Sequence, residues 1–402
     1  MTSPQRTRLS LADLRDSTAF PKSDYIDLLY RVMLQRTPDP NGLRSYSRRE
    51  DVHNFFREIL DSSEFKQKSR NTAYFGGNSV DRKRILLFGA YGNGNLGDAI
   101  QATSLLHAIK CIRQDIEVWA CSLLPCQFPF PFEYVLPPSQ IFNASVLNHF
   151  DLIIIGGGGL LAHPHDPLTS EEWQAAVDVP IALFGVGAGG QVASRCNTLI
   201  TKAVYVSGRD EPSLTALSNF RGDAQFVPDP VLADPRYYTA DSDDCQPRGA
   251  QGKRLWIIKN TATARNSGVL RYIDPSEDDI CFLEPFLDFP LLNMFPTARA
   301  LYFLDDFLRL IDQATEVISM RYHGCILAML RSKPVIGLFE QKSRDLLTRY
   351  GLGHCFSGDG LGFPNSSNGV RASDKIIGDQ EVFQRELTKI LSLLGTTPPQ
   401  YR

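Results

Sequence analysis

Short apolar runs recur along the sequence from Arg84 onward, and longer segments with helical periodicity separate them. This alternation is typical of a parallel sheet with helices on both faces, because parallel strands need long crossover connections. Two groups of strands are predicted: 85–88, 118–122, 152–155, 181–184, 204–207 and 225–227, then 255–258, 281–283, 317–319 and 335–338. The sequence therefore predicts an α/β protein with two doubly wound, Rossmann-like domains that face a central cleft.

Two stretches rich in turn-forming residues divide the chain of 402 residues into three parts. Residues 71–81 are rich in Gly and Asn and lack periodicity, and residues 236–253 are polar with several Asp, Gly and Pro. We predict a small all-α domain at 1–75, where apolar residues recur at helical spacing. The Rossmann-like domains are then expected at 82–235 and at 253–402, the second ending in a closing helix.

The composition excludes several classes of protein. The chain has 42 Lys and Arg against 45 Asp and Glu, so it lacks the basic excess that nucleic-acid binding demands. Its eight cysteines contain no paired CxxC motifs, so we expect reduced thiols and no metal cofactor. The sequence shows neither a secretory signal nor an apolar run of about 18 to 20 residues, so we expect a cytoplasmic protein without a transmembrane segment.

A glycine-rich loop, GNGNLGD at 92–98, follows the first predicted strand and opens a helix. It matches the GxGxxG fingerprint of dinucleotide binding, but no acidic residue ends the second strand, and Glu117 lies at its beginning. Backbone N–H groups at a helix N-terminus still favour an anionic or hydroxyl-rich ligand, so Asn95 and Gly97 are predicted to border one. Asp98 either touches that ligand or caps the helix.

Two more predicted strands end in glycine clusters, at 156–159 and at 185–190. Three such clusters at the carboxyl ends of neighbouring strands predict a ligand-binding rim, because open α/β sheets bind ligands at this edge. Gly157 and Gly158 are expected to let a ligand approach the backbone. Tight turns with positive φ are the alternative explanation for these glycines.

Polar side chains flank the predicted rim. His163 and His165 follow the second glycine cluster in a Pro-containing loop and face either the rim or solvent. Arg209 comes directly after the strand at 204–207. A cation at this edge either pairs with Asp210, Asp229 or Asp234 or binds an anionic ligand.

The strongest constellation is Ser319-Met320-Arg321-Tyr322-His323-Gly324, at the end of one predicted strand and the start of a helix at 325–330. Period-two alternation would place Ser319, Arg321 and His323 on one face of an extended chain. Arg offers a planar fork to a carboxylate or phosphate, and His exchanges a proton near neutral pH. The pattern indicates an anion site with an acid or base beside it. The alternative is that Arg321 and His323 have only a structural role, as members of a hydrogen-bond network at the sheet edge.

Several motifs together resemble a known family. In chain order they are Gly94-Asn95-Leu96-Gly97-Asp98, the glycine run at 156–159, Ser207-Gly208-Arg209-Asp210, Pro228-Asp229-Pro230 and Ser319-x-Arg321-x-His323-Gly324, with Ala328, Pro334 and Lys342 after them. Through these motifs, residues 84–355 resemble the polysaccharide pyruvyl transferase family. Residues 25–66 are similar to a helical domain of unknown function that is often joined to bacterial surface-glycan proteins.

The resemblance implies a fold like that of two-domain, GT-B-type glycosyltransferases and transfer of pyruvate from phosphoenolpyruvate to a sugar as a ketal. Arg209 and Arg321 would bind the anionic groups of this donor, and His323 would act as general acid. Asp98, or a His of the loop 163–165, would accept the hydroxyl proton. The acceptor would be a lipid-linked or oligosaccharide intermediate of a bacterial cell-surface polysaccharide or exopolysaccharide, which would bring the enzyme to the inner face of the membrane.

Two other functions fit the same sequence. A nucleotide-sugar glycosyltransferase would share the architecture and differ in the donor. A non-catalytic glycan-binding protein is the third hypothesis, because residues 260–300 show no pattern of the family. The presence of Arg209, Arg321 and His323 together argues against it.

Overall fold

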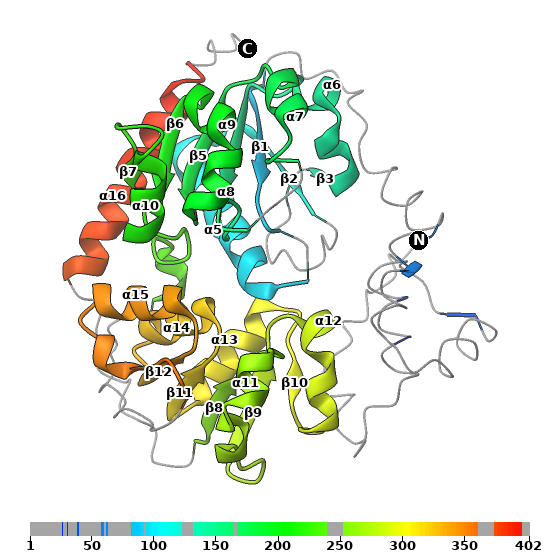
Figure 1. Cartoon of the computed structure of the whole chain (residues 1–402), viewed down its shortest axis with the longest axis vertical. Coiled ribbons are helices and arrows are strands. Elements are labelled where there is room, and N and C mark those ends of the chain that lie inside the picture. The colour runs from blue at the N-terminus through cyan, green and yellow to red at the C-terminus, as the bar shows by residue number, and fades with distance from the viewer. Residues whose placement is uncertain are drawn as a thin grey trace, which may run out of the picture.

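The computed structural model describes residues 82–91, 94–122, 132, 134–163, 167–238, 252–360 and 374–395, together with Ile26, Tyr30, Pro38, Asp39, Glu58, Ile59 and Ser62. The predicted all-α domain at 1–75 therefore lies almost entirely outside the described residues. Within the described ranges the chain forms two parallel sheets, each associated with its own set of helices (Figure 1).

The first sheet has seven strands in the order β3-β2-β1-β4-β5-β6-β7 among the described residues. Its strands are β1 (Arg84–Phe88), β2 (Glu117–Cys121), β3 (Tyr134–Leu136), β4 (Leu152–Gly156), β5 (Ile181–Val186), β6 (Tyr205–Gly208) and β7 (Gln225–Phe226). Its helices are α5 (Leu96–Ile112), α6 (Ala144–Leu147), α7 (Glu171–Ala176), α8 (Gly190–Arg195), α9 (Asn197–Lys202) and α10 (Glu211–Ser218), with 3₁₀ turns η3 (Pro138–Phe142) and η4 (Pro235–Tyr237).

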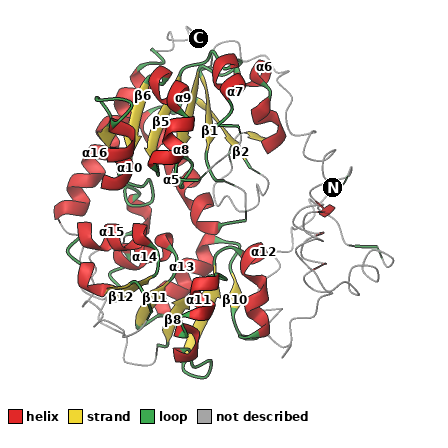
Figure 2. Cartoon of the chain, viewed as in Figure 1, coloured by secondary structure: helices red, strands yellow, loops and turns green. Residues whose placement is uncertain are grey.

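The second sheet has six described strands in the order β10-β9-β8-β11-β12-β13. They are β8 (Arg254–Ile257), β9 (Asp278–Phe282), β10 (Arg299–Ala300), β11 (Glu316–Ser319), β12 (Val335–Leu338) and β13 (Phe356–Ser357). The helices that follow are α11 (Ala262–Asn266), α12 (Pro285–Asp288), α13 (Leu304–Gln313), α14 (Tyr322–Leu330), α15 (Gln341–Arg349) and α16 (Asp374–Ser392), with 3₁₀ turns η5 (Val269–Tyr272), η6 (Phe289–Asn293) and η7 (Gly353–Cys355). Figure 2 shows the helices packed around the strands of both sheets.

The central strands are buried along nearly their whole length, as their continuous apolar sequences require. All of β4 is buried, and in β1 only Arg84 is partly exposed. The two strands pair in parallel from Ile85 opposite Leu152 onward. Helices cover both faces of such a sheet, so apolar residues are needed on both sides. The predicted α/β fold with two doubly wound domains is confirmed.

Both sheets reverse their strand order at one point, between β1 and β4 in the first and between β8 and β11 in the second. The loops that leave such a switch point diverge and open a crevice at the carboxyl ends of the strands. Here the carboxyl edges of the two sheets contact each other. The backbone N–H of Leu96, which begins α5, donates to the carbonyl of Leu283 just after β9 at 2.8 Å.

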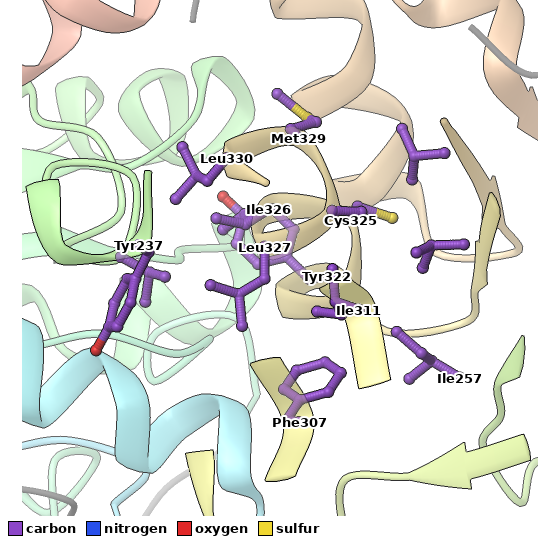
Figure 3. Close-up of a cluster of buried hydrophobic side chains, with 14 of the residues drawn as sticks. Tyr237, Ile257, Phe307, Ile311, Tyr322, Cys325, Ile326, Leu327, Met329 and Leu330 are labelled. Atoms are coloured by element: carbon purple, nitrogen blue, oxygen red, sulfur yellow. The ribbon is translucent and has the colours of Figure 1, made fainter. Parts of the chain in front are cut away.

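The first turn of α5 is packed into the core of the second domain. Leu96 and Ile100 belong to the apolar cluster that contains Phe307 and Leu327. Figure 3 shows part of this cluster, in which Tyr237 points toward α5. The Tyr237 hydroxyl lies 3.4 Å from that of Ser104 on the same helix. The two domains therefore share one apolar core at their junction.

Helix α16 closes the structure by crossing back to the first sheet. A boundary at 253–402 groups this helix with the second sheet, yet its inner residues Phe383, Leu387 and Ile390 join the apolar cluster of the first. The Phe383 ring meets that of Phe184 on β5 edge to face, with centroids 5.2 Å apart. Near the start of the helix, Ile376 still belongs to the apolar cluster of the second sheet, so α16 packs on both domains in turn.

We expect Phe383→Ala to lower the free energy of unfolding by about 3–5 kcal/mol, because the substitution leaves a cavity against Phe184. Ile377 lies on the same helix but is 47% exposed, so Ile377→Ala is the matched control and should cost less than about 0.5 kcal/mol. Urea unfolding followed by circular dichroism measures both. Equal effects of the two substitutions would contradict the packing of α16 on the first sheet.

Candidate active site

The turn between β11 and α14 carries the strongest sequence motif. Helix α14 begins at Tyr322, three residues earlier than predicted. The hydroxyl of Ser319 donates to the carbonyl of Arg321 at 2.7 Å and accepts from its N–H at 3.1 Å. A side chain on Gly324 would overlap this hydroxyl, which explains the glycine. Because the chain turns into a helix here, the expected common face of Ser319, Arg321 and His323 is not formed, and Ser319 shapes the turn.

Arg321 is buried and held by two carboxylates of the same domain. Its Nη1 donates to Glu284 Oε2 at 2.7 Å, and its Nη2 donates to Asp288. Burial raises the pKa of Glu284, and the negative charges of Asp288 and Asp98 add to this shift while Arg321 opposes it. The guanidinium thus neutralises carboxylates that the segment 260–300 supplies. Nothing in the sequence indicated Glu284 or Asp288 as partners of Arg321.

We expect Arg321→Ala to lower the free energy of unfolding by about 3–5 kcal/mol, because it leaves two buried carboxylates without their cation. Arg331, just after the end of the same helix, pairs with the partly exposed Asp312. Arg331→Ala is therefore the control and should cost at most about 1 kcal/mol. Urea unfolding checks both variants, and a small effect at Arg321 would contradict a structural role for this ion cluster.

His323 is buried between the two domains. Its Nε2 lies 3.6 Å from Asp229 Oδ2, and Asp229 follows β7 of the first sheet. On its other side the imidazole packs against Gly97 in the first turn of α5, where a side chain would overlap Nδ1. The Nε2 atom has no hydrogen-bond partner among the described residues. The predicted residues Gly97 and His323 thus come together, although they are far apart in sequence.

Asp229 is completely buried and meets groups from both domains. It accepts hydrogen bonds from the Gln101 side chain and from the backbone N–H of Val231, the latter at 3.0 Å. Burial acts to raise the pKa of Asp229, but His323, Arg209 and the Val231 hydrogen bond outweigh it, so this pKa lies below its usual range. The sequence indicated Asp229 only as a partner of Arg209 and as part of the motif Pro228-Asp229-Pro230, and it did not predict the contact with His323.

Arg209, buried just after β6, faces the ring of Tyr322. Its guanidinium carbon lies 4.9 Å from the ring centroid, and the Lys342 ammonium lies 5.8 Å from the same centroid. The acidic neighbours of Arg209 are at longer range than a charge-assisted hydrogen bond, with Nε 3.5 Å from Asp210 and Nη1 3.8 Å from Asp229. Asp210 caps α10 by accepting from Ser213.

A cavity of about 720 Å³ lies between α10 of the first domain and α14 and α15 of the second. Arg209, Tyr322 and Lys342 are all part of its wall, and Phe226 and Arg349 line it further along. Lys342 lies 3.2 Å from Glu340, which also accepts from Lys259 at 2.7 Å. Among the described residues, the wall thus contains four basic side chains and three acidic ones, and Arg209 and Lys342 are the two cations next to the Tyr322 ring. The sequence motif contained Lys342, but sequence reasoning did not include it among the site residues.

The other predicted site residues line the edge of the first sheet. Asn95 caps α5 by accepting from Gly97 N–H at 3.0 Å, and Asp98 is buried in the first turn of that helix. Gly157 and Gly158 have φ of +74° and +71°, a left-handed conformation that favours glycine. A Cβ on Gly157 would also stand 2.7 Å from Gln101 Oε1. Tight turns and a close side-chain approach thus account for these two glycines.

The loop after the second glycine cluster is described only in part. His163 is exposed, and its backbone N–H donates to Gly159 at 3.2 Å. His165 lies outside the described residues. Among the residues that are described, no group of three or more His, Cys, Asp or Glu could hold a metal ion. The described helices include none with the length and apolar character to cross a membrane.

We expect Gly97→Ala to lower the free energy of unfolding by about 1–3 kcal/mol, because its methyl group would push His323 and α5 apart. Gly190 also lies at a helix start but has open space around it, so Gly190→Ala is the control. Alanine favours helix, so this control should be neutral or stabilising by up to about 1 kcal/mol. Thermal unfolding distinguishes the two, and equal melting temperatures would contradict the close contact.

Comparison with known proteins identifies the family. The family profile described as polysaccharide pyruvyl transferase matches residues 95–338. No curated protein matches the chain. The Staphylococcus aureus MnaA–UDP structure is 13% identical with a TM-score of 0.47, covering 80% of this chain and all of that one. The Methanocaldococcus jannaschii UDP-GlcNAc 2-epimerase with UDP-GlcNAc and UDP is 12% identical with a TM-score of 0.49, covering 76% and 99%.

The glycosyltransferase SnogD from Streptomyces nogalater is 14% identical with a TM-score of 0.43, covering 78% of this chain and all of that one. Likeness to these solved structures, at such low identity, concerns the fold alone. The family profile, by contrast, spans more than half of the chain and includes the loops that meet at the candidate site. This chain is therefore a transferase that belongs to the polysaccharide pyruvyl transferase family.

Proposed function

We propose that this chain transfers pyruvate from phosphoenolpyruvate to two hydroxyls of a sugar in the synthesis of a bacterial cell-surface polysaccharide. Membership of the family supports polysaccharide pyruvylation in general. The observation that carries the choice of donor is the pair of cations, Arg209 and Lys342, on the Tyr322 side of one cavity. Phosphoenolpyruvate presents a carboxylate and a phosphate, each of which such cations bind.

Arg209 and Lys342 suit a bound anion better than Arg321 does. The contacts of Arg209 with Asp210 and Asp229 are long, so its guanidinium can gain shorter hydrogen bonds to a ligand. Arg321 was expected to bind the donor, but both of its Nη atoms are held by carboxylates of its own domain. We therefore assign the donor contacts to Arg209 and Lys342, and we assign Arg321 to holding the turn before α14.

His323 is the proposed general acid. It is not itself a residue of the cavity wall, but it is the neighbour of Tyr322, which is, and the centroids of the two rings lie 5.3 Å apart in an edge-to-face contact. Protonation of the donor's methylene carbon makes the enol carbon electrophilic, and a sugar hydroxyl attacks it. A second hydroxyl then replaces phosphate, which closes the ketal. The methylene carbon gains one proton when it becomes a methyl group, and the first hydroxyl loses one. The proton of the second hydroxyl leaves with inorganic phosphate. Asp98, in the first turn of α5, is the proposed acceptor of the hydroxyl proton.

Calorimetric titration with phosphoenolpyruvate, without any acceptor, tests the donor site. We expect Arg209→Ala and Lys342→Ala each to weaken binding by about 10- to 100-fold, since each removes a charge-assisted contact. Lys259→Ala is the matched control, because Lys259 also pairs with Glu340 but does not line the cavity. Its affinity should stay within about threefold of the wild type.

His323→Gln should bind phosphoenolpyruvate with nearly unchanged affinity while phosphate release with a panel of sugar acceptors falls by about 100-fold. Loss of donor binding in this variant would contradict its role as an acid. If the wild type binds UDP-GlcNAc and not phosphoenolpyruvate, the pyruvyl donor is wrong and a nucleotide-sugar transferase is favoured. If the wild type binds neither phosphoenolpyruvate nor UDP-GlcNAc but does bind sugars of the acceptor panel, the non-catalytic hypothesis is favoured.

A further inference from the structure

We propose that Asp229 is the positioning residue for His323, so that the acid of the reaction is assembled from two domains. Asp229 follows β7 of the first sheet, and His323 lies in the first turn of α14, beside the second. Their pairing at 3.6 Å therefore exists only while the carboxyl edges of the two sheets are in contact. The inference rests on the proposed function for the role of His323 as an acid, but the pairing itself can be tested without any substrate.

The Asp229 carboxylate is oriented by its own domain before it meets His323. The backbone N–H of Val231 donates to Oδ1, and the Gln101 side chain donates to Oδ2. Two donors from different elements fix the plane of the carboxylate, which also has no exposure to solvent. Oδ2 is the oxygen that faces both His323 and Arg209. A carboxylate held in this way can fix the orientation of an imidazole and hold the proton at its Nε2.

The imidazole is restricted on its remaining sides as well. Gly97 packs against the Nδ1 side and leaves no room for a side chain, and the Tyr322 ring lies edge to face with it. Because Nε2 has no hydrogen-bond partner within the described part of the chain, Asp229 is the nearest group that compensates a proton there. A buried imidazolium without such a carboxylate would be strongly disfavoured. Asp229 thus stabilises a proton on His323 Nε2, a role that is distinct from those proposed for Arg209 and Asp98.

The charged and titratable groups around His323 set the sign of the expected effect. The Asp229 carboxylate, 3.6 Å from Nε2, favours a positive charge on the imidazole. Arg209 opposes it, and the Tyr322 hydroxyl is neutral because burial raises its pKa far above the usual range. The depressed pKa of Asp229 means that its carboxylate is ionised at neutral pH. Neutralising Asp229 therefore removes the carboxylate that faces the imidazole and leaves the Arg209 guanidinium, 3.8 Å from the same oxygen, to disfavour a second positive charge.

The experiment measures the His323 pKa by NMR titration of the full chain with isotopically labelled histidine, the resonance being assigned by its loss in His323→Gln. Asp229→Asn should move the midpoint of this titration to lower pH, whereas Asp229→Glu should restore part of the change. Asp234→Asn is the matched control, because Asp234 is a buried carboxylate of the same loop that pairs with Arg236. It should leave the His323 pKa unchanged.

A His323 pKa in Asp229→Asn that equals the wild-type value would overturn the inference, whatever the donor turns out to be. If Asp229→Asn does not fold, Asp229→Ser supplies a smaller neutral side chain with the same expected shift. With active wild-type enzyme, the alkaline limb of the turnover profile should move to lower pH in Asp229→Asn by the same amount. A wild type that lacks phosphoenolpyruvate turnover but shows the NMR shift would refute the proposed function and leave the Asp229 pairing standing.

Discussion

The first turn of α5 belongs to one sheet by chain connectivity and to the other by packing. Leu96 donates its backbone N–H to Leu283, and together with Ile100 it is buried in the apolar cluster of the second domain. Gly97, between them, lets the helix touch His323 directly. The candidate active site depends on this contact, because burial of apolar side chains there sets the distance between Asp229 at the edge of one sheet and His323 at the edge of the other.

The charged side chains near the contact between the two domains form two groups with different environments. Arg321, Glu284 and Asp288 satisfy one another in the interior, so this group holds a turn in place. Arg209 and Lys342 have longer contacts and line a cavity. A buried ion cluster is stable only when every member is paired, whereas cations with incomplete partners can still gain from an anionic ligand. The geometry of the pairs therefore distinguishes a fully paired ion cluster from cations that line a cavity.

The predictability of the fold varied with burial. Strands such as β1 and β4 are covered on both faces, so their sequences are continuous apolar runs that predict them directly. The strands β3, β10 and β13 were not predicted. Each lies at the edge of its sheet or consists of very few residues, and an element paired on one side only needs little apolar sequence.

The sequence by itself determined which residues follow the carboxyl end of each strand, because the order of strand, loop and helix is local. Glycine loops and the Arg321-x-His323 motif could be placed at the sheet edges on that basis alone. Only the tertiary structure decided that Arg321 turns to Glu284 and that His323 turns to Asp229. These partners are far apart in sequence, and the pairing that brings His323 to Asp229 exists only because apolar packing brings two separate domains together.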